Sequence, residues 1–234
     1  YPYSSIVSLR DAISDTTNTT PRVALDDVNY IRNSVKATVD AYSGEVTLYA
    51  WDDTDPLLQA WQKVYPSTLK PVSEMSADLM SHVRYPTDLF KVQRAMLGTY
   101  HVDDAASFYA RDNAWKTPND PVSQADVLQP PYYLSMKMPG QEAPTFSMFT
   151  SFIPAAEGDG ARNVLMGYLA VDSDAGSTAG QKAADYGKLR MLEISADVSE
   201  ESQVWLRAQV EEWIRALLAQ GAPLELDAEH AAML

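Results

Sequence analysis

The sequence contains no cysteine among its 234 residues. A chain without thiols forms no disulfide, has no cysteine nucleophile and binds neither an iron–sulfur cluster nor a zinc ion through sulfur. Several classes of enzyme are thereby excluded. Many proteins of this size fold without disulfides in any compartment, so the missing cysteine leaves the location open.

Histidine is scarce as well, with only His82, His101 and His230 in the chain. None of them forms a helical pair spaced for zinc or stands beside a glycine-flanked serine, so no catalytic triad can be assembled. A phosphate-binding loop is also missing, because Gly158-Asp159-Gly160 is not followed by lysine and a hydroxyl residue. Nucleotide chemistry of the common kind is therefore excluded.

Long apolar runs are absent, and none approaches the roughly 20 residues that a membrane-spanning helix needs. The first five residues have neither the basic start nor the apolar stretch of a signal peptide, and the chain does not begin with methionine. We therefore expect a soluble piece of a longer polypeptide whose targeting segment lies elsewhere.

Basic residues are few: the chain has 18 lysines and arginines against 32 aspartates and glutamates, which gives a net charge of −14. Such a surface repels a phosphate backbone and offers few cations to displace its counterions, so we predict that nucleic acid is not a partner. Direct adhesion to anionic lipid is disfavoured for the same reason. The acidity either keeps a surface domain soluble or attracts cationic ligands and metal ions.

The rest of the composition, with 46% hydrophobic and 21% charged residues, is typical of a globular protein with a real core. Residues 34–42 alternate apolar and polar side chains, and the alternation resumes at Val46 after Ser43-Gly44, which predicts a β-hairpin. Asp55-Pro56 predicts the start of a helix, as a cap followed by proline at the first helical position. Further helices are expected at about 73–83, at 86–100, and from a cap at Asp103 to Tyr109.

The second half of the chain has the pattern of strands. Residues 116–131 carry four prolines and predict a long loop. Strand-like runs follow at 132–138, 145–153, 164–171 and 189–194, and residues 200–220 have the apolar stripe of an amphipathic helix. Because strands and helices are mixed, we predict an α+β fold, a mainly antiparallel sheet flanked by several helices with long Pro/Asp/Gly-rich loops. The expected organisation is an irregular approach at 1–33, the α+β domain at 34–195, the helix at 196–221 and a tail at 222–234.

Two acidic clusters are candidates for binding a hard cation. Asp52 and Asp53 stand between a predicted strand and the helix that Asp55 caps, so they either help to gather calcium or simply face solvent. Asp172 and Asp174 open like a calcium loop, but Ala183 stands where an EF-hand needs its closing glutamate. The EF-hand interpretation fails, and the alternatives are a different calcium site or a plain turn. No other cofactor is expected.

Four strings of the sequence resemble a known family: NYIRNSVKATVDAY at 29–42, YPTDLFKVQ at 85–93, PPYYL at 130–134 and YGKLR at 186–190. They are similar to the uncharacterised protein family 0182 of bacterial membrane proteins, in matching order along roughly the first 195 residues. The resemblance implies a longer protein with an N-terminal block of membrane-spanning helices and a large extracytoplasmic region that includes this chain. It implies no activity and carries over no catalytic residue.

The missing catalytic motifs favour an extracytoplasmic binding or interaction module, with a protein or an envelope polymer as its partner. The proline-rich loop at 116–131 and the hairpin edge at 45–51 are the expected contact regions, since an open strand edge accepts another chain. The alternative is an envelope-directed hydrolase or carbohydrate-active enzyme that uses carboxylates, with or without calcium, in a cleft beside that loop. A purely structural domain is the third hypothesis.

Overall fold

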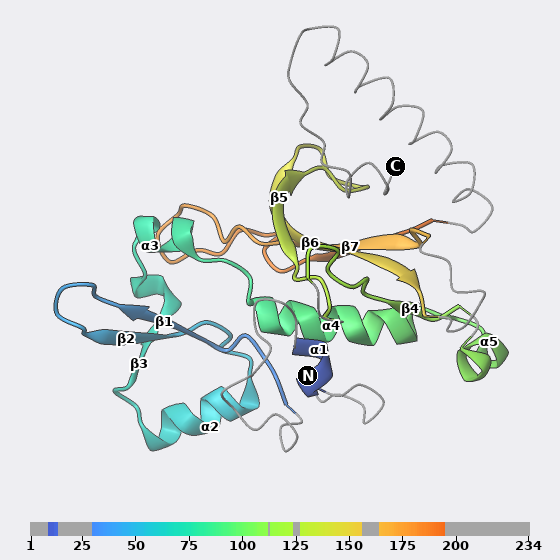
Figure 1. Cartoon of the computed structure of the whole chain (residues 1–234). Coiled ribbons are helices and arrows are strands. Elements are labelled where there is room, and N and C mark those ends of the chain that lie inside the picture. Colours follow the sequence, from blue (N-terminus) through green and yellow to red (C-terminus); the bar gives the residue numbers. More distant parts are fainter. Residues whose placement is uncertain (1–8, 14–29, 112, 124–126, 156–163, 195–234) are drawn as a thin grey trace, which may run out of the picture.

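The computed structural model describes residues 9–13, 30–111, 113–123, 127–155 and 164–194 (Figure 1). The helix predicted at 196–221, the tail at 222–234 and most of the approach at 1–33 lie outside the described residues. The elements, in chain order, are α1 (Leu9–Ile13), β1 (Val35–Val39), β2 (Val46–Ala50), α2 (Pro56–Val64), β3 (Leu69–Pro71), the 3-10 helix η2 (Val72–Glu74), α3 (Ala77–His82), α4 (Thr87–Tyr100), α5 (Ala105–Ala110), β4 (Trp115–Lys116), β5 (Tyr132–Met136), β6 (Thr145–Pro154), β7 (Gly167–Asp172) and β8 (Leu189–Glu193).

The predicted α+β fold with antiparallel-rich sheets is confirmed, although the described strands form two sheets instead of one. The smaller sheet has the order β1-β2-β3, and β1 and β2 form the predicted antiparallel hairpin. Its turn closes where Gly44 donates its N–H to the carbonyl of Asp40, with Gly44 in the left-handed region at φ 73°. The parallel strand β3 has only three residues and was not predicted.

Helix α2 crosses from β2 to β3 and begins as the sequence predicts. The side chain of Asp55 accepts a hydrogen bond of 2.9 Å from the N–H of Leu57, and Pro56 occupies the first turn, where its missing N–H costs nothing. The cap of α5 was predicted one residue too early. Asp104, and not Asp103, accepts the N–H of Ser107.

The larger sheet is antiparallel throughout, with the order β4-β6-β7-β8. Strand β6 has ten residues, and it shares one edge between two partners. Its first half pairs with β5, where Thr145 lies opposite Met136, and its end pairs with β4, where Ile153 lies opposite Lys116. The strands predicted after residue 131 are therefore confirmed, while the two-residue β4 was not foreseen.

Helix α4 lies against this sheet and supplies the main core (Figure 1). Leu89 and Phe90 of the helix contact Met148 and Phe152 of β6 within one cluster of buried side chains. The helix approaches β4 closely at Gly98, where an added Cβ would lie 2.6 Å from the carbonyl oxygen of Trp115. Only glycine permits this contact between helix and strand.

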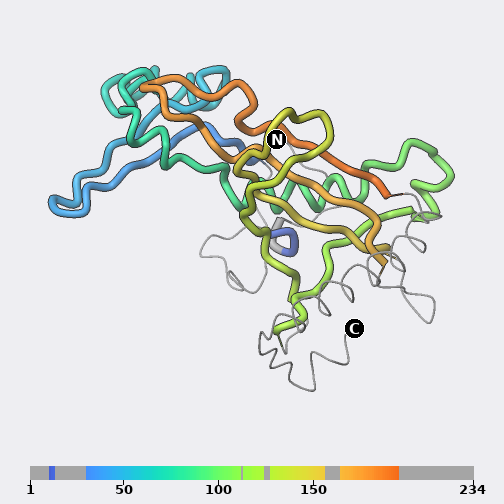
Figure 2. The backbone as a smooth tube through the Cα atoms, turned by 90° about the horizontal axis from the view of Figure 1, so that it is seen from above, coloured from blue at the N-terminus to red at the C-terminus, as the bar shows by residue number. Residues whose placement is uncertain are grey.

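A second buried cluster lies under the small sheet and contains Tyr49, Trp51, Met75 and Met80. Tyr186 packs against both this cluster and the main core. Tyr186 therefore links the two clusters, beside contacts such as the hydrogen bond from the Gly180 N–H to the carbonyl of Met75. Figure 2 shows the hairpin of β1 and β2 projecting from the body of the molecule beyond this junction.

Candidate functional site

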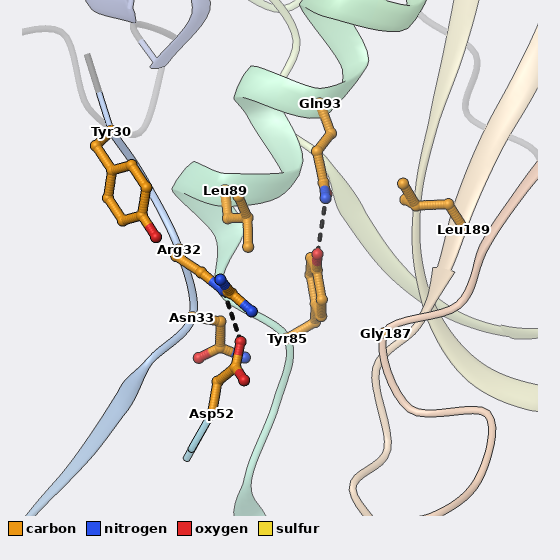
Figure 3. A pocket seen from close by; sticks show the side chains of 9 residues that line it. All are labelled: Tyr30, Arg32, Asn33, Asp52, Tyr85, Leu89, Gln93, Gly187 and Leu189. Atoms are coloured by element: carbon orange, nitrogen blue, oxygen red, sulfur yellow. Dashed lines mark hydrogen bonds and ion pairs between the residues drawn. The ribbon is translucent and has the colours of Figure 1, made fainter. Parts of the chain in front are cut away.

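A pocket of about 550 Å³ opens between the small sheet and helix α4 (Figure 3). One wall comes from the segment that leads into β1, with Asp52 from two residues after β2. The other walls come from α4 with Tyr85, two residues before it, and from the start of β8 with Gly187, two residues before that strand. The lining residues are Tyr30, Arg32, Asn33, Asp52, Tyr85, Leu89, Gln93, Gly187 and Leu189.

An ion pair forms the polar rim of this pocket. The Nε of Arg32 donates to Asp52 at 2.7 Å, and its Nη2 donates to the hydroxyl of Thr54 at 2.8 Å. Side-chain hydrogen bonds with Tyr30 and with Asp52 raise the pKa of Arg32 above its usual value. A guanidinium has five N–H donors, which is more than these three partners accept, so donors of Arg32 remain for a ligand.

Asp52 is ionised in this arrangement. Burial alone would raise the pKa of Asp52, but hydrogen bonds from Thr54 and from Arg32 outweigh it and hold the pKa below its usual range. The neighbouring Asp55 is buried and accepts the hydroxyls of Tyr30 and Ser34. Those two bonds fix the segment 30–34 against the start of α2, and so they position Arg32.

The inner wall of the pocket combines amide, phenol and aliphatic groups. The hydroxyl of Tyr85 donates to the side chain of Gln93 in α4 at 3.0 Å, as the dashed line in Figure 3 marks. Leu89 and Leu189 add apolar surface beside this pair. Asn33 donates from the opposite side to the hydroxyl of Tyr186 at 3.3 Å. The walls are therefore preorganised by bonds among the lining residues and their neighbours.

Both predicted calcium clusters are found among described residues, at different places. Asp52 belongs to the rim described above, while the exposed Asp53 accepts from Gln59 through its backbone carbonyl. Within the part of the chain that the structure describes, no three acidic or histidine side chains are grouped to share a metal ion. Calcium binding at these aspartates therefore stays a prediction.

Asp172 and Asp174 line a second pocket of about 410 Å³ beside β6. The buried carboxylate of Asp172 accepts from Gln141 at 2.8 Å, from Thr145 at 3.0 Å and from Arg190 at 3.1 Å. Asp174 is exposed, accepts the N–H of Gly176 and lies 3.9 Å from the guanidinium of Arg84. The carboxylate that a calcium ion would need most is thus already held by three donors.

Of the residues that line the larger pocket, the sequence pointed only to Asp52. Tyr30, Arg32 and Gln93 belong to no recognised chemical motif, and their proximity depends on how the hairpin and α4 meet. One signal was present: of the four strings that carry the family resemblance, those at 29–42, 85–93 and 186–190 all contribute to the walls.

The expected contact regions differ from the structure in one respect. The hairpin edge predicted at 45–51 belongs to β2, which lies between β1 and β3, so this prediction was wrong and the edge strand is β1. The proline-rich loop at 116–131 is closed across its base by a bridge between Asn119 and Leu128.

The fold and the pocket define an α+β domain with a ligand-sized opening between its two halves. Comparison with known proteins supplies the family: the model of the Uncharacterised protein family (UPF0182) matches residues 1–216, so this chain belongs to that family. No solved structure matches the chain.

The chain is similar to UPF0182 proteins of several bacteria. It is 65% identical over 196 residues to one from Leifsonia xyli subsp. xyli, with 83% of this chain and 20% of the relative covered. The identity is 60% over 202 residues with a relative from Clavibacter michiganensis subsp. michiganensis, with 84% and 20% covered, and 48% over 213 residues with one from Tropheryma whipplei, with 84% and 22% covered.

The chain thus spans about a fifth of the length of these relatives, with 20% of the first of them covered. Among the helices that the structure describes, none has the length and apolar character needed to cross a bilayer.

Proposed function

We propose that this chain is a ligand-binding module of a longer membrane protein, placed on the extracytoplasmic side, and that it acts by binding and not by catalysis. The observation that carries the proposal is the pocket of about 550 Å³, whose polar groups are held in place by neighbouring residues while facing the opening. Pockets of this size and preorganisation are typical of sites for small molecules. The length of the relatives supports a longer polypeptide, and the membrane-bound setting is what the family resemblance implies.

The chemistry of the walls favours a neutral ligand rich in hydroxyl and amide groups. Arg32 and Asp52 offset each other's charge, so the rim presents a donor and an acceptor with little net attraction for a free ion. Asn33 and Gln93 each carry an amide that both donates and accepts. Tyr85 and Leu89 provide apolar contact for a carbon skeleton. A saccharide of an envelope polymer combines these features.

A carboxylate-dependent hydrolase needs an acid and a base that face a common cleft. In the second pocket, Asp172 and Asp185 both contact the guanidinium of Arg190, at 3.1 and 3.7 Å. Their carboxylates thus hold one arginine between them. The binding function is therefore the better supported of the two.

Oligosaccharides of β-1,4-linked N-acetylglucosamine, which carry both hydroxyl and acetamido groups, are the probe for this function. We expect saturable binding by calorimetry, and an Arg32→Met variant that binds about tenfold more weakly or worse, because charge-assisted hydrogen bonds to the guanidinium are lost. Arg111→Met is the matched control, since Arg111 is exposed at the far end of α5.

Two results would overturn the proposal: no binding of any oligosaccharide, or equal binding by the two arginine variants once both are shown to be folded. Native mass spectra of the protein as purified, recorded with and without a chelator, test the calcium prediction in parallel. A mass of bound calcium that the chelator removes would confirm that prediction.

A further inference from the structure

The hairpin of β1 and β2 turns most of its aliphatic face to solvent, while Leu48 is half-buried and Ala50, at the base of the hairpin, is buried. Along this face Val35 lies opposite Ala50, Ala37 opposite Leu48 and Val39 opposite Val46. The exposed fraction is 65% for Val39 and 59% for Val46. Antiparallel sheets of soluble proteins usually place such a face on the core and the polar face outward.

The opposite face of the same hairpin is polar and is turned inward. Tyr49 is buried in the cluster under the small sheet, and Lys36, its cross-strand partner, reaches the ring of Trp51. The aliphatic face is therefore the outer one, because side chains alternate strictly along a strand and a slip by one residue would exchange the faces.

Two neighbouring surfaces are also exposed: the open edge of β1 and one side of α2. In the described part of the chain β1 pairs with β2 alone, so its other edge has backbone donors and acceptors available for a further strand. Helix α2, which follows β2, presents a second exposed apolar stripe at Leu57, Trp61, Val64 and Tyr65, spaced so that they share one side of the helix.

We propose that the aliphatic face of β1 and β2 is an interface with another segment of the same polypeptide, outside residues 1–234, and that this segment is extended and aliphatic. It pairs with the open edge of β1 or lies across Val39 and Val46. This inference rests on the small sheet alone and does not depend on a ligand in the pocket.

The choice of occupant follows from length and chemistry. The matched relatives are about five times longer than the region they share with this chain, since only 20% of their length is covered. Most of such a polypeptide is available to cover the hairpin. The face carries branched aliphatic side chains without a charge, which is the composition of a permanent interior contact and not of a transient one.

Accessibility of single cysteines tests the proposal, since the chain has no cysteine of its own. Val39→Cys reports on the aliphatic face, and Val122→Cys is the matched control because Val122 is 88% exposed on the loop between β4 and β5. Maleimide labelling of each site is followed by peptide mass spectrometry in the 234-residue chain and in the full-length polypeptide. In the short chain we expect similar labelling rates at both sites. In the full-length polypeptide we expect labelling at Cys-substituted position 39 to slow at least tenfold, with no change at position 122.

Equal labelling of Val39→Cys in both forms would overturn the inference. Protection already present in the short chain, together with a dimer mass in solution, would overturn it in favour of a second copy as the occupant. A Val39→Ser variant guards against an effect of the cysteine itself: it should leave the thermal midpoint of the short chain unchanged and lower that of the full-length polypeptide.

Discussion

At the scale of single residues, the site shows how polar groups are held where a sequence offers no motif for them. Arg32 is positioned by Asp52 and Thr54, and its segment is held by the bonds that Tyr30 and Ser34 make to Asp55. The cap of a helix therefore also orients the rim of a pocket. Of these residues, only Asp55 has the role that the sequence predicts for it, because a cap depends on neighbours in the chain, whereas Asp52 was a calcium candidate and pairs with Arg32.

Lys36 carries a charge that the fold tolerates poorly. Its Nζ donates to the carbonyl of Arg84 at 3.0 Å and lies 5.4 Å from the centre of the Trp51 ring. Burial lowers the pKa of Lys36 from 10.5 to about 8. Below about pH 8 the folded protein holds Lys36 in its charged form, and the burial of this charge then lowers the free energy of unfolding by its full amount.

The pH dependence of stability follows from this shift. Between pH 8 and pH 10.5 the unfolded chain holds the Lys36 proton that the folded chain has released, so the free energy of unfolding rises with pH in this range. Lys36→Met removes that rise and stabilises the protein by about 1 to 2 kcal/mol at neutral pH, allowing for the partial exposure of the side chain. Urea unfolding as a function of pH measures both effects, and Lys137→Met, at an exposed position, should show neither. A parallel pH dependence for Lys36→Met and the unsubstituted protein would contradict the assignment.

At the scale of elements, local patterns predicted most of the fold. The hairpin, α2, α4 and the strands after residue 131 follow from alternation, caps and apolar spacing, which are properties of adjacent residues. The three-residue β3 and two-residue β4 have too few residues to show a period, and they are strands because of the partners that they meet. For the same reason the edge of the small sheet was assigned to the wrong strand: strand order is a property of the assembled sheet.

The contact between α4 and β4 depends on one glycine. A Cβ at Gly98 would lie 2.6 Å from the backbone oxygen of Trp115, and a backbone atom cannot move aside as a flexible side chain does. Gly98→Ala should therefore destabilise the protein by about 1 to 3 kcal/mol, although alanine is the better helix former by about 1 kcal/mol. Thermal unfolding measures the change, with Thr99→Ala as a control in the same helix. An alanine variant as stable as the unsubstituted protein would mean that β4 does not lie this close to α4.

At the scale of the whole molecule, the two sheets have separate buried clusters, and the pocket lies where the two halves meet. Tyr186 belongs to the contacts of both clusters. Its ring lies 5.3 Å from that of Trp51 and 5.9 Å from that of Tyr85, measured between centroids. Its hydroxyl donates to the carbonyl of Arg84 at 3.1 Å, and burial raises the pKa of Tyr186 above its usual range. Coupling between the halves, and with it the shape of the pocket, should therefore depend on this residue.

Substitution of Tyr186 separates the hydroxyl from the ring. Tyr186→Phe keeps both ring contacts and should cost about 1 kcal/mol for the lost hydrogen bonds. Tyr186→Ala should cost about 3 to 5 kcal/mol and leave a cavity between the clusters. Because the ring joins them, we expect hydrogen exchange to show the small sheet opening independently of the large sheet in Tyr186→Ala, but together with it in Tyr186→Phe and in the control Tyr109→Ala, where the ring is exposed. If the two sheets still open together in Tyr186→Ala, their coupling must run through other contacts, and the pocket should then keep its affinity in that variant.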